Sequence, residues 1–339
     1  MERLNLRRAT PLGVFISLII LAAAVTLALI DRVTTTPIPE DQHEVPDDIR
    51  LSGRPVQALA RLEAQAAVSG WTPALLKAAG DLWREAGDLT RAVPYWDAAL
   101  AHDPAPALLR DLASAYLELA QWDDARAVLN AYLADELSEA DRRWAAFQRG
   151  LLLISVDPAQ AEADLRTARA EPAYAPVIDS LFAALDASPF SRLRLALVFG
   201  EARLWSHAER VLLQAGAGEG LDIVGYARLR AYLAYVRAQM GRDASELLHY
   251  ALELAPADAQ VRTFEGLYWR ARGDLAASRD ALLAAVALEP DNPTLYAELA
   301  AALELLGDTQ QARHWLERAV AFSDGDPRFQ ALLDALPPP

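Results

Sequence analysis

The chain of 339 residues contains no cysteine. This absence excludes disulfides, thiolate metal sites, cysteine nucleophiles and lipoprotein acylation. Lysine is nearly absent too, since Lys77 is the only one and the other basic residues are arginines. The formal net charge is −15, so no cationic surface can dominate the molecule. We therefore expect no nucleic-acid partner, because binding to phosphates requires a clustered cationic surface.

Recognisable signatures of catalysis and of metal binding are also missing. No histidine stands four residues from another or within an H-E-x-x-H motif, so scattered surface or groove positions are the expected reading. We expect no catalytic residue, no metal and no cofactor, and hence a protein that is not an enzyme. The histidines are His43, His102, His207, His249 and His314.

The glycine-rich tract 216–220 resembles a phosphate-binding loop only superficially. A phosphate loop lies between a strand and the start of a helix, whereas this tract follows a helical pattern over Val211 to Ala215. The sequence therefore predicts a helix C-cap and a turn between repeats at this tract.

The residues that are abundant indicate an all-α protein. Hydrophobic residues make up 53% of the chain, mostly as alanine and leucine, and aromatic residues make up 8%. Alanine and leucine are strong helix formers, while the β-branched and aromatic residues that favour strands are sparse. The chain is expected to fold around a sizeable helical core.

A long apolar run near the N-terminus predicts a membrane anchor. Residues 11–30 contain no charged side chain and are long enough for one spanning helix. Arginines precede the run within the tail 1–10, whereas the segment 31–52 after it is acidic and contains prolines. The positive-inside rule then places the N-terminus in the cytoplasm, the remaining chain outside it, and residues 31–52 as a stalk.

A cleaved signal peptide is the alternative to a signal anchor. Residues 22–24 form an A-x-A sequence of the kind that signal peptidase cleaves. However, the apolar run continues beyond it to Ile30, which would leave an apolar new N-terminus. This favours the anchor, and the cleaved form stays open as a secreted repeat protein.

A period of 34 residues organises the rest of the chain. Gly273 and Asp274 recur as Gly307 and Asp308, and Ala285 recurs as Ala319. Each unit contains a Gly-Asp turn, an apolar helical segment and an acidic or prolyl stop. The clearest unit begins at Pro73 and contains Leu76, Gly80, Trp83, Ala92, Trp96, Ala99 and Pro104.

With these residues the sequence resembles the tetratricopeptide repeat family, whose 34-residue helix–turn–helix units stack side by side. The resemblance implies an all-α, tetratricopeptide-like solenoid of about seven helical hairpins over residues 73–324, preceded by one transmembrane helix. Further copies begin at Pro106, near Trp144 and near Pro189. Three more contain Gly241, Gly266 and Tyr296.

The ends of the array need helices that cover them. Residues 53–72 show apolar residues at helical spacing and predict an N-terminal capping helix. Asp326 and Pro327 have the types expected of an N-cap and a first helical residue, so 325–339 predicts a C-terminal capping helix and a proline tail. The helical segment 174–188 has no repeat position, and whether it divides the array stays open.

The resemblance also implies where a partner would bind. In this family the first helix of each repeat lines a concave groove, so we expect a peptide or a partner helix there. The basic residues that grip a C-terminal carboxylate in one branch of the family are only partly present, because Asp81 and Ser114 stand where that branch has asparagine. The candidate groove residues are Lys77, Asp81, Arg84, Glu85, Arg110, Ser114, Glu118, Gln260, Thr263 and Arg270.

These features predict a membrane-anchored scaffold that mediates protein–protein interaction or the assembly of an envelope complex. The alternative is a permanent structural subunit of a membrane complex, with the spanning helix as a packing element.

Overall fold

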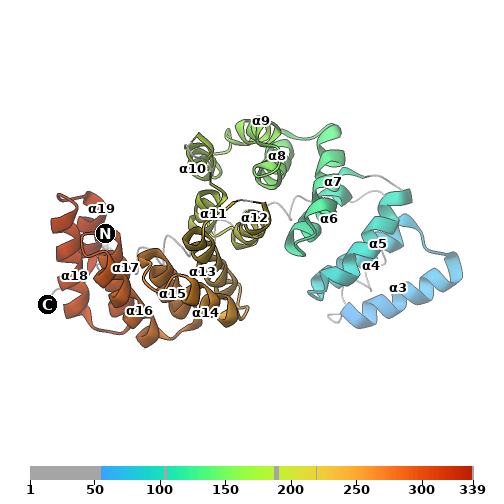
Figure 1. The fold of residues 1–339 in the computed structure, drawn as a ribbon. Helices are drawn as coiled ribbons and strands as arrows, with labels where there is room; N and C mark the ends of the chain where they lie inside the picture. Colours follow the sequence, from blue (N-terminus) through green and yellow to red (C-terminus); the bar gives the residue numbers. More distant parts are fainter. Residues whose placement is uncertain (1–54, 103–104, 187–190, 219, 338–339) are drawn as a thin grey trace, which may run out of the picture. The chain divides into compact units, whose positions relative to one another are not determined.

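The computed structural model describes residues 55–102, 105–186, 191–218 and 220–337. Within these ranges the chain forms 17 α-helices, labelled α3 to α19, and no strand (Figure 1). Contacts divide the described residues into an N-terminal unit, 55–198, and a C-terminal unit, 199–337. The division falls inside helix α11, a short distance after the segment 174–188 whose role the sequence left open.

Helical hairpins build the N-terminal unit, where α4 packs on α5, α6 on α7, and α8 on α9. Helix α3 lies against α4, and α10 follows α9 outside the hairpin pattern. The bounds are α3 (Pro55–Ser69), α4 (Pro73–Glu85), α5 (Leu89–His102), α6 (Pro106–Glu118), α7 (Trp122–Ala134), α8 (Glu139–Leu153), α9 (Pro158–Ala168), α10 (Ala175–Asp186) and α11 (Arg192–Glu201).

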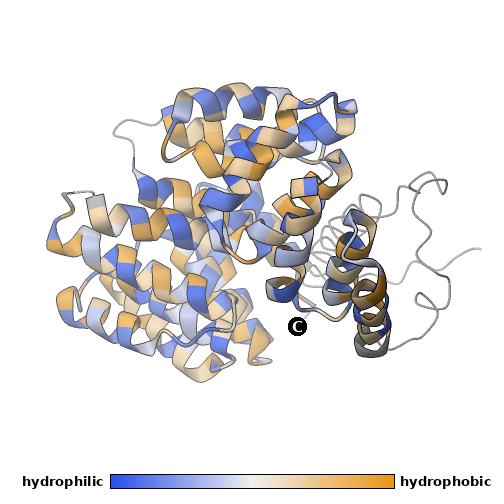
Figure 2. Cartoon of the chain, turned by 90° about the vertical axis from the view of Figure 1, so that its right-hand side faces the viewer, coloured by the Kyte–Doolittle hydropathy of each residue, from blue (hydrophilic) through white to orange (hydrophobic). Residues whose placement is uncertain are grey.

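The C-terminal unit continues the pattern. Helix α13 packs on α14, α15 on α16, and α17 on α18, while α19 covers α18. Figure 2 shows hydrophobic and hydrophilic residues interspersed along the helices of the chain, as expected for amphipathic helices that share a core. The bounds are α12 (Trp205–Gly218), α13 (Ile223–Gln239), α14 (Ser245–Leu254), α15 (Ala259–Arg272), α16 (Leu275–Leu288), α17 (Pro293–Leu305), α18 (Thr309–Phe322) and α19 (Pro327–Ala335).

The Gly-Asp turns have a direct structural cause. Gly273 and Gly307 adopt positive φ angles of 84° and 82°, a conformation that glycine reaches without steric cost. The following aspartates, Asp274 and Asp308, then accept hydrogen bonds from backbone N–H groups in the first turns of α16 and α18. Each pair therefore ends one helix and begins the next.

Two hairpins make the same turn without glycine. Ala120 and Arg203 stand at the equivalent repeat position and have φ angles of 56° and 60°. A side chain in this region is strained, so the packing of the two helices imposes the conformation on these residues. The repeat geometry is thus stronger than the local preference of the residue.

Small residues mark the points where the two helices of a hairpin come closest. A Cβ atom added at Gly80 would lie 2.4 Å from the ring of Trp96, and one at Gly266 would lie 2.5 Å from Leu282 Cγ. Gly150 and Leu165 make the same contact in another hairpin, at 2.7 Å. These distances are too short for a methyl group, so the predicted glycine positions are contact points between helices.

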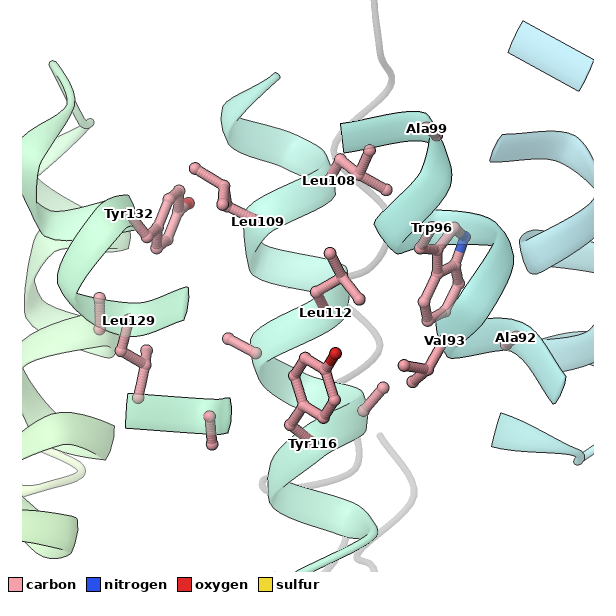
Figure 3. Close-up of a cluster of buried hydrophobic side chains, with 14 of the residues drawn as sticks. Ala92, Val93, Trp96, Ala99, Leu108, Leu109, Leu112, Tyr116, Leu129 and Tyr132 are labelled. Carbon is pink, nitrogen blue, oxygen red and sulfur yellow. The ribbon is translucent and has the colours of Figure 1, made fainter. Parts of the chain in front are cut away.

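Large residues beside these contacts form the core of the N-terminal unit (Figure 3). Helix α6 lies between α5 and α7, with Leu112 directed toward Trp96 and Leu109 directed toward Tyr132. Trp96 and Leu112 are fully buried. Since each hairpin shares its apolar residues with the next, the core continues from repeat to repeat.

The third hairpin replaces part of this apolar contact by an ion pair. Arg149 of α8 donates two hydrogen bonds of 2.7 Å to the carboxylate of Asp164 on α9, whose side chain is buried. Asn130 and Gln160 add further hydrogen bonds to the pair. The third hairpin therefore combines the glycine contact with a buried ion pair.

Several predictions are settled by these helices. The all-α class with tetratricopeptide-like hairpins is confirmed, as is the N-cap at Asp326, which accepts from the N–H of Arg328. The glycine tract was interpreted wrongly in one respect, because α12 runs through Gly216 to Gly218 instead of ending at Ala215. Gly216 has space around it, so a continuous helix is compatible with the packing.

The membrane anchor falls outside what the structure describes. In the described ranges no helix combines the length and the apolar character needed to cross a bilayer. The tail 1–10, the anchor 11–30 and the stalk 31–52 lie outside those ranges, as do residues 53–54 of the capping helix, Pro189 at the start of the fourth copy, and residues 338–339 of the tail.

The contact at Gly266 gives a test of the repeat packing. We expect Gly266→Ala to lower the free energy of unfolding of the C-terminal unit by about 1–3 kcal/mol, because the new methyl group would overlap Leu282. Gly216→Ala is the control, since its Cβ would meet Leu229 at an ordinary 3.7 Å and alanine favours a helix by about 0.5–1 kcal/mol. Chemical unfolding followed by circular dichroism measures both variants. Equal stability of the two would contradict the packing argument.

Candidate functional site

The predicted groove residues form two sets, one in each unit. Seven lie on the first helices α4 and α6 of the N-terminal unit, and Gln260, Thr263 and Arg270 lie on α15 of the C-terminal unit. The surface formed by the seven is called the first-helix face below. It comprises Lys77, Asp81, Arg84, Glu85, Arg110, Ser114 and Glu118.

On α4 the charged residues of this face are joined to one another. Lys77 Nζ lies 2.7 Å from a carboxylate oxygen of Asp81, and Arg84 lies 3.6 Å from the other oxygen. Asp81 also accepts a hydrogen bond of 3.1 Å from the indole Nε1 of Trp96, which is fully buried. Asp81 therefore has a structural role, because it satisfies a polar atom of the core.

Ion pairs also run from one repeat to the next. Arg84 of α4 donates a hydrogen bond of 2.7 Å to Asp111 of α6, and Arg110 of α6 is paired with Asp141 of α8. Arg84 lies 5.3 Å from the centre of the Trp96 ring, and Arg110 lies 5.1 Å from that of Trp144. Each guanidinium is thus held by a carboxylate and an aromatic ring.

The candidate residue Arg270 makes the corresponding pair in the C-terminal unit. It lies 3.0 Å from Glu298 of α17, at the same repeat positions as Arg84 and Asp111. Thr263 donates its hydroxyl to the backbone oxygen of Ala259 at 2.7 Å, and Gln260 is half-buried. The pairing between consecutive first helices is therefore a recurring feature.

Sequence reasoning missed the acidic partners Asp111, Asp141 and Glu298. The sequence did contain a signal for them. An acidic residue follows Arg84 by 27 residues and Arg270 by 28. This spacing is about two helical turns shorter than one repeat, so the acid lies on the first helix of the next repeat. The cations at Lys77, Arg84 and Arg110 were predicted as groove residues outside the core. The structure shows that carboxylates of the same chain pair with all three.

Other residues of the face are available to a partner. Glu85 and Glu118 stand at equivalent positions near the ends of α4 and α6, and both are exposed. In the part of the chain that the structure describes, neither carboxylate belongs to an ion pair. Whether the ten predicted residues bind a partner stays a prediction.

Burial dominates the electrostatics at Asp111. Desolvation raises the pKa of this carboxyl above its usual value, although Arg84 and Lys77 oppose the shift. The described ranges contain no group of three or more histidine, aspartate or glutamate side chains arranged to hold a metal ion. The ion pairs of the first-helix face hold its charged side chains in fixed positions and present hydrogen-bonding groups to a partner.

One helical segment now matches a known family model. Residues 270–336 match the model described as "Tetratricopeptide repeat", and they span the end of α15, helix α16, the hairpin α17–α18 and α19. Over these residues the sequence is similar to the tetratricopeptide repeat family. The other hairpins share the helix–turn–helix arrangement of this segment, which gives the described chain its tetratricopeptide-like fold.

Comparison with solved structures gives tetratricopeptide proteins at low identity. A tetratricopeptide repeat protein from Parabacteroides merdae is 18% identical with a TM-score of 0.34, and the alignment covers 85% of this chain and 94% of that one. A thermophilic tetratricopeptide protein of Thermus thermophilus is 17% identical with a TM-score of 0.26 over 78% and 99% of the two chains. At such TM-scores these superpositions carry no argument about function.

A third structure is the tetratricopeptide domain pair of yeast Sti1 in complex with pHSP90, at 14% identity and a TM-score of 0.31. It covers 78% of this chain and 98% of the yeast domain pair. No curated protein matches the chain.

The pair between α4 and α6 is testable by charge reversal. Arg84→Glu should lower the free energy of unfolding of the N-terminal unit by about 0.5–1 kcal/mol, because it places three carboxylates together at a partly exposed site. Adding Asp111→Arg should recover part of the loss by restoring an attractive pair. Arg126→Glu is the control, since its partner Asp123 is 91% exposed. Thermal unfolding of the four proteins measures the effect, and a loss at Arg84 no larger than at Arg126 would contradict it.

One predicted surface or groove histidine is buried instead. His207 of α12 lies 5.6 Å from the ring of Phe199, and only 8% of it is exposed. Burial, with a smaller contribution from Arg210, lowers the pKa of His207 from 6.5 to about 3. The folded protein therefore keeps this imidazole neutral at pH values where the unfolded chain is protonated.

This difference predicts a pH-dependent stability. Above pH 6.5 neither state is protonated at His207 and stability is full. As the pH falls toward 3, only the unfolded chain takes up the proton and stability decreases. Between pH 6.5 and 5 the loss is about 2 kcal/mol. His207→Gln should abolish this part of the pH dependence, whereas His249→Gln should retain it because the side chain of His249 is 77% exposed. The free energy of unfolding of both variants is measured at pH 6.5 and pH 5. An equal change in the two variants would contradict the assignment of this pH dependence to His207.

Proposed function

We propose that this protein is a scaffold that binds protein partners along the first-helix face of its repeats. The observation that carries the proposal is the fixed set of ion pairs across α4, α6 and α8, which holds the charged side chains of one face in place. A surface whose side chains are already ordered loses little conformational entropy when a partner binds. The tetratricopeptide repeats at residues 270–336 support the same reading, because this fold serves protein–protein interaction.

We further propose that residues 11–30 anchor the protein in a membrane, with the repeats outside the cytoplasm and residues 31–52 as the stalk. The uncharged run and the arginines before it support this topology. A scaffold in this position would gather partners of an envelope complex. We infer that it has no catalytic role of its own, since helical hairpins fill the described part of the chain and use their closest contacts for packing.

The test is partner capture from solubilised membranes with the full chain as bait. The variant Glu85→Lys with Glu118→Lys changes two exposed charges on the first-helix face and leaves its ion pairs intact. We expect it to lose most of the partner captured by the wild type, with a larger loss at low salt because exposed charges are screened at high salt. Mass spectrometry of the captured proteins provides the measurement.

The control variant is Glu63→Lys with Glu136→Lys, which makes the same change in net charge at exposed positions on α3 and before α8. Equal capture by both variants would place the interface on another surface. A partner retained in fixed ratio by every variant would favour a permanent structural subunit. Recovery of the full chain in the soluble fraction of cells would overturn the anchor.

A further inference from the structure

A second surface lies in the C-terminal unit, where a groove of about 190 Å³ runs between α12 and α13. Its floor is apolar, because Leu212, Leu229 and Leu233 line it and are nearly or fully buried. Leu213 stands at its edge with 49% of its surface exposed. The groove therefore offers an apolar contact that water covers in the isolated chain.

The glycine-rich end of α12 keeps this groove open. Gly216 and Ala217 line it, and both are exposed. A Cβ atom at Gly216 would meet Leu229 only at 3.7 Å, so larger side chains at this end of the helix would occupy the groove. The tract that resembled a phosphate loop thus has a packing consequence, because small residues expose the leucine floor.

One cation faces the groove. The guanidinium of Arg230 lies 4.8 Å from the ring centre of Tyr226 and 5.9 Å from that of Tyr250. Its Nε donates a hydrogen bond of 2.9 Å to the hydroxyl of Tyr226. Over the described ranges it forms no ion pair with a carboxylate. The two rings hold the guanidinium in place without neutralising its charge.

Neighbouring arginines on the same helix are paired differently. Arg228 binds Asp258 at 2.6 Å and Arg237 binds Glu209 at 2.8 Å. Arg230 differs from these two neighbours, because aromatic rings and not a carboxylate hold its guanidinium beside the apolar floor.

We propose that this groove binds a protein segment in which a carboxylate side chain stands next to leucine-like side chains. The carboxylate would pair with Arg230, and the apolar side chains would cover the leucine floor beside Leu213. Charge complementarity selects this occupant, since the groove supplies one unneutralised cation and an apolar surface. The inference rests on the proposed function as a protein-binding scaffold and adds a partner class and a second surface.

The test uses a short, blocked and fluorescently labelled peptide of leucine and glutamate, added to the full chain in detergent. Fluorescence anisotropy should show saturable binding. Arg230→Gln should weaken it at least about tenfold, because a charge-assisted hydrogen bond is lost. Ala217→Leu, which fills the groove without changing a charge, should weaken it as well. Circular dichroism confirms that the variants fold.

Matched controls separate the groove from the repeat surface. Leu213→Glu should abolish binding, whereas Leu283→Glu should retain it. Leu283 has the same repeat position in α16 and is 39% exposed, but it lies outside the groove. A peptide with glutamine in place of glutamate should bind at least about tenfold more weakly. A peptide with a free C-terminus and no glutamate tests whether a terminal carboxylate can replace the glutamate side chain. If this peptide binds as tightly as the leucine–glutamate peptide, the groove does not require a carboxylate side chain and the proposal is wrong.

Three further results would overturn the inference: no binding of the leucine–glutamate peptide, equal binding to Arg230→Gln, or equal binding of the glutamine peptide. Each leaves the proposed function standing if the wild-type chain still captures a partner that the Glu85 and Glu118 variant loses. If the peptide binds but the Glu85 and Glu118 variant captures as much partner as the wild type, the proposed first-helix face is wrong and the groove proposal stands.

Discussion

The close contact between a glycine or alanine on one helix and a large residue on the next is the constraint on which this structure depends. At Gly80, Gly150 and Gly266 the partner side chain occupies the space of the missing Cβ. This contact fixes the distance between the two helices of a hairpin. The remaining large residues then fill the grooves beside the contact, and the core continues into the next hairpin. The positive φ angles at Ala120 and Arg203 also follow from this packing, because the positions of the two helices require a left-handed residue in the turn that joins them.

Charge is distributed to suit this architecture. Arginine–carboxylate pairs connect the first helices of consecutive repeats in the N-terminal unit. Such pairs contribute modestly to stability when they are partly exposed, but their geometry orders the side chains. The net negative charge of the chain therefore gives a poor description of this face, where each arginine is matched by an acid.

The two candidate surfaces differ in how they would recognise a partner. On the first-helix face the cations are neutralised, which leaves exposed carboxylates such as Glu85 and Glu118 to interact. In the α12–α13 groove no carboxylate of the described residues pairs with Arg230, which is held by tyrosines. A scaffold with both surfaces could distinguish partners by charge, because one surface disfavours acidic segments and the other favours them.

The sequence alone determined the helical class, the hairpin pattern from Pro73 onward and the contact glycines, because the 34-residue period and the Gly-Asp turns are local signals. It also placed the candidate residues of α4 and α6 on one face. Only the tertiary structure decided which charges on that face are neutralised. It also decided that His207 is buried and that α12 continues through Gly216 to open a groove. These outcomes depend on residues about one repeat apart in the chain, such as Arg84 and Asp111, whose proximity is set by the packing of helices and not by any local preference.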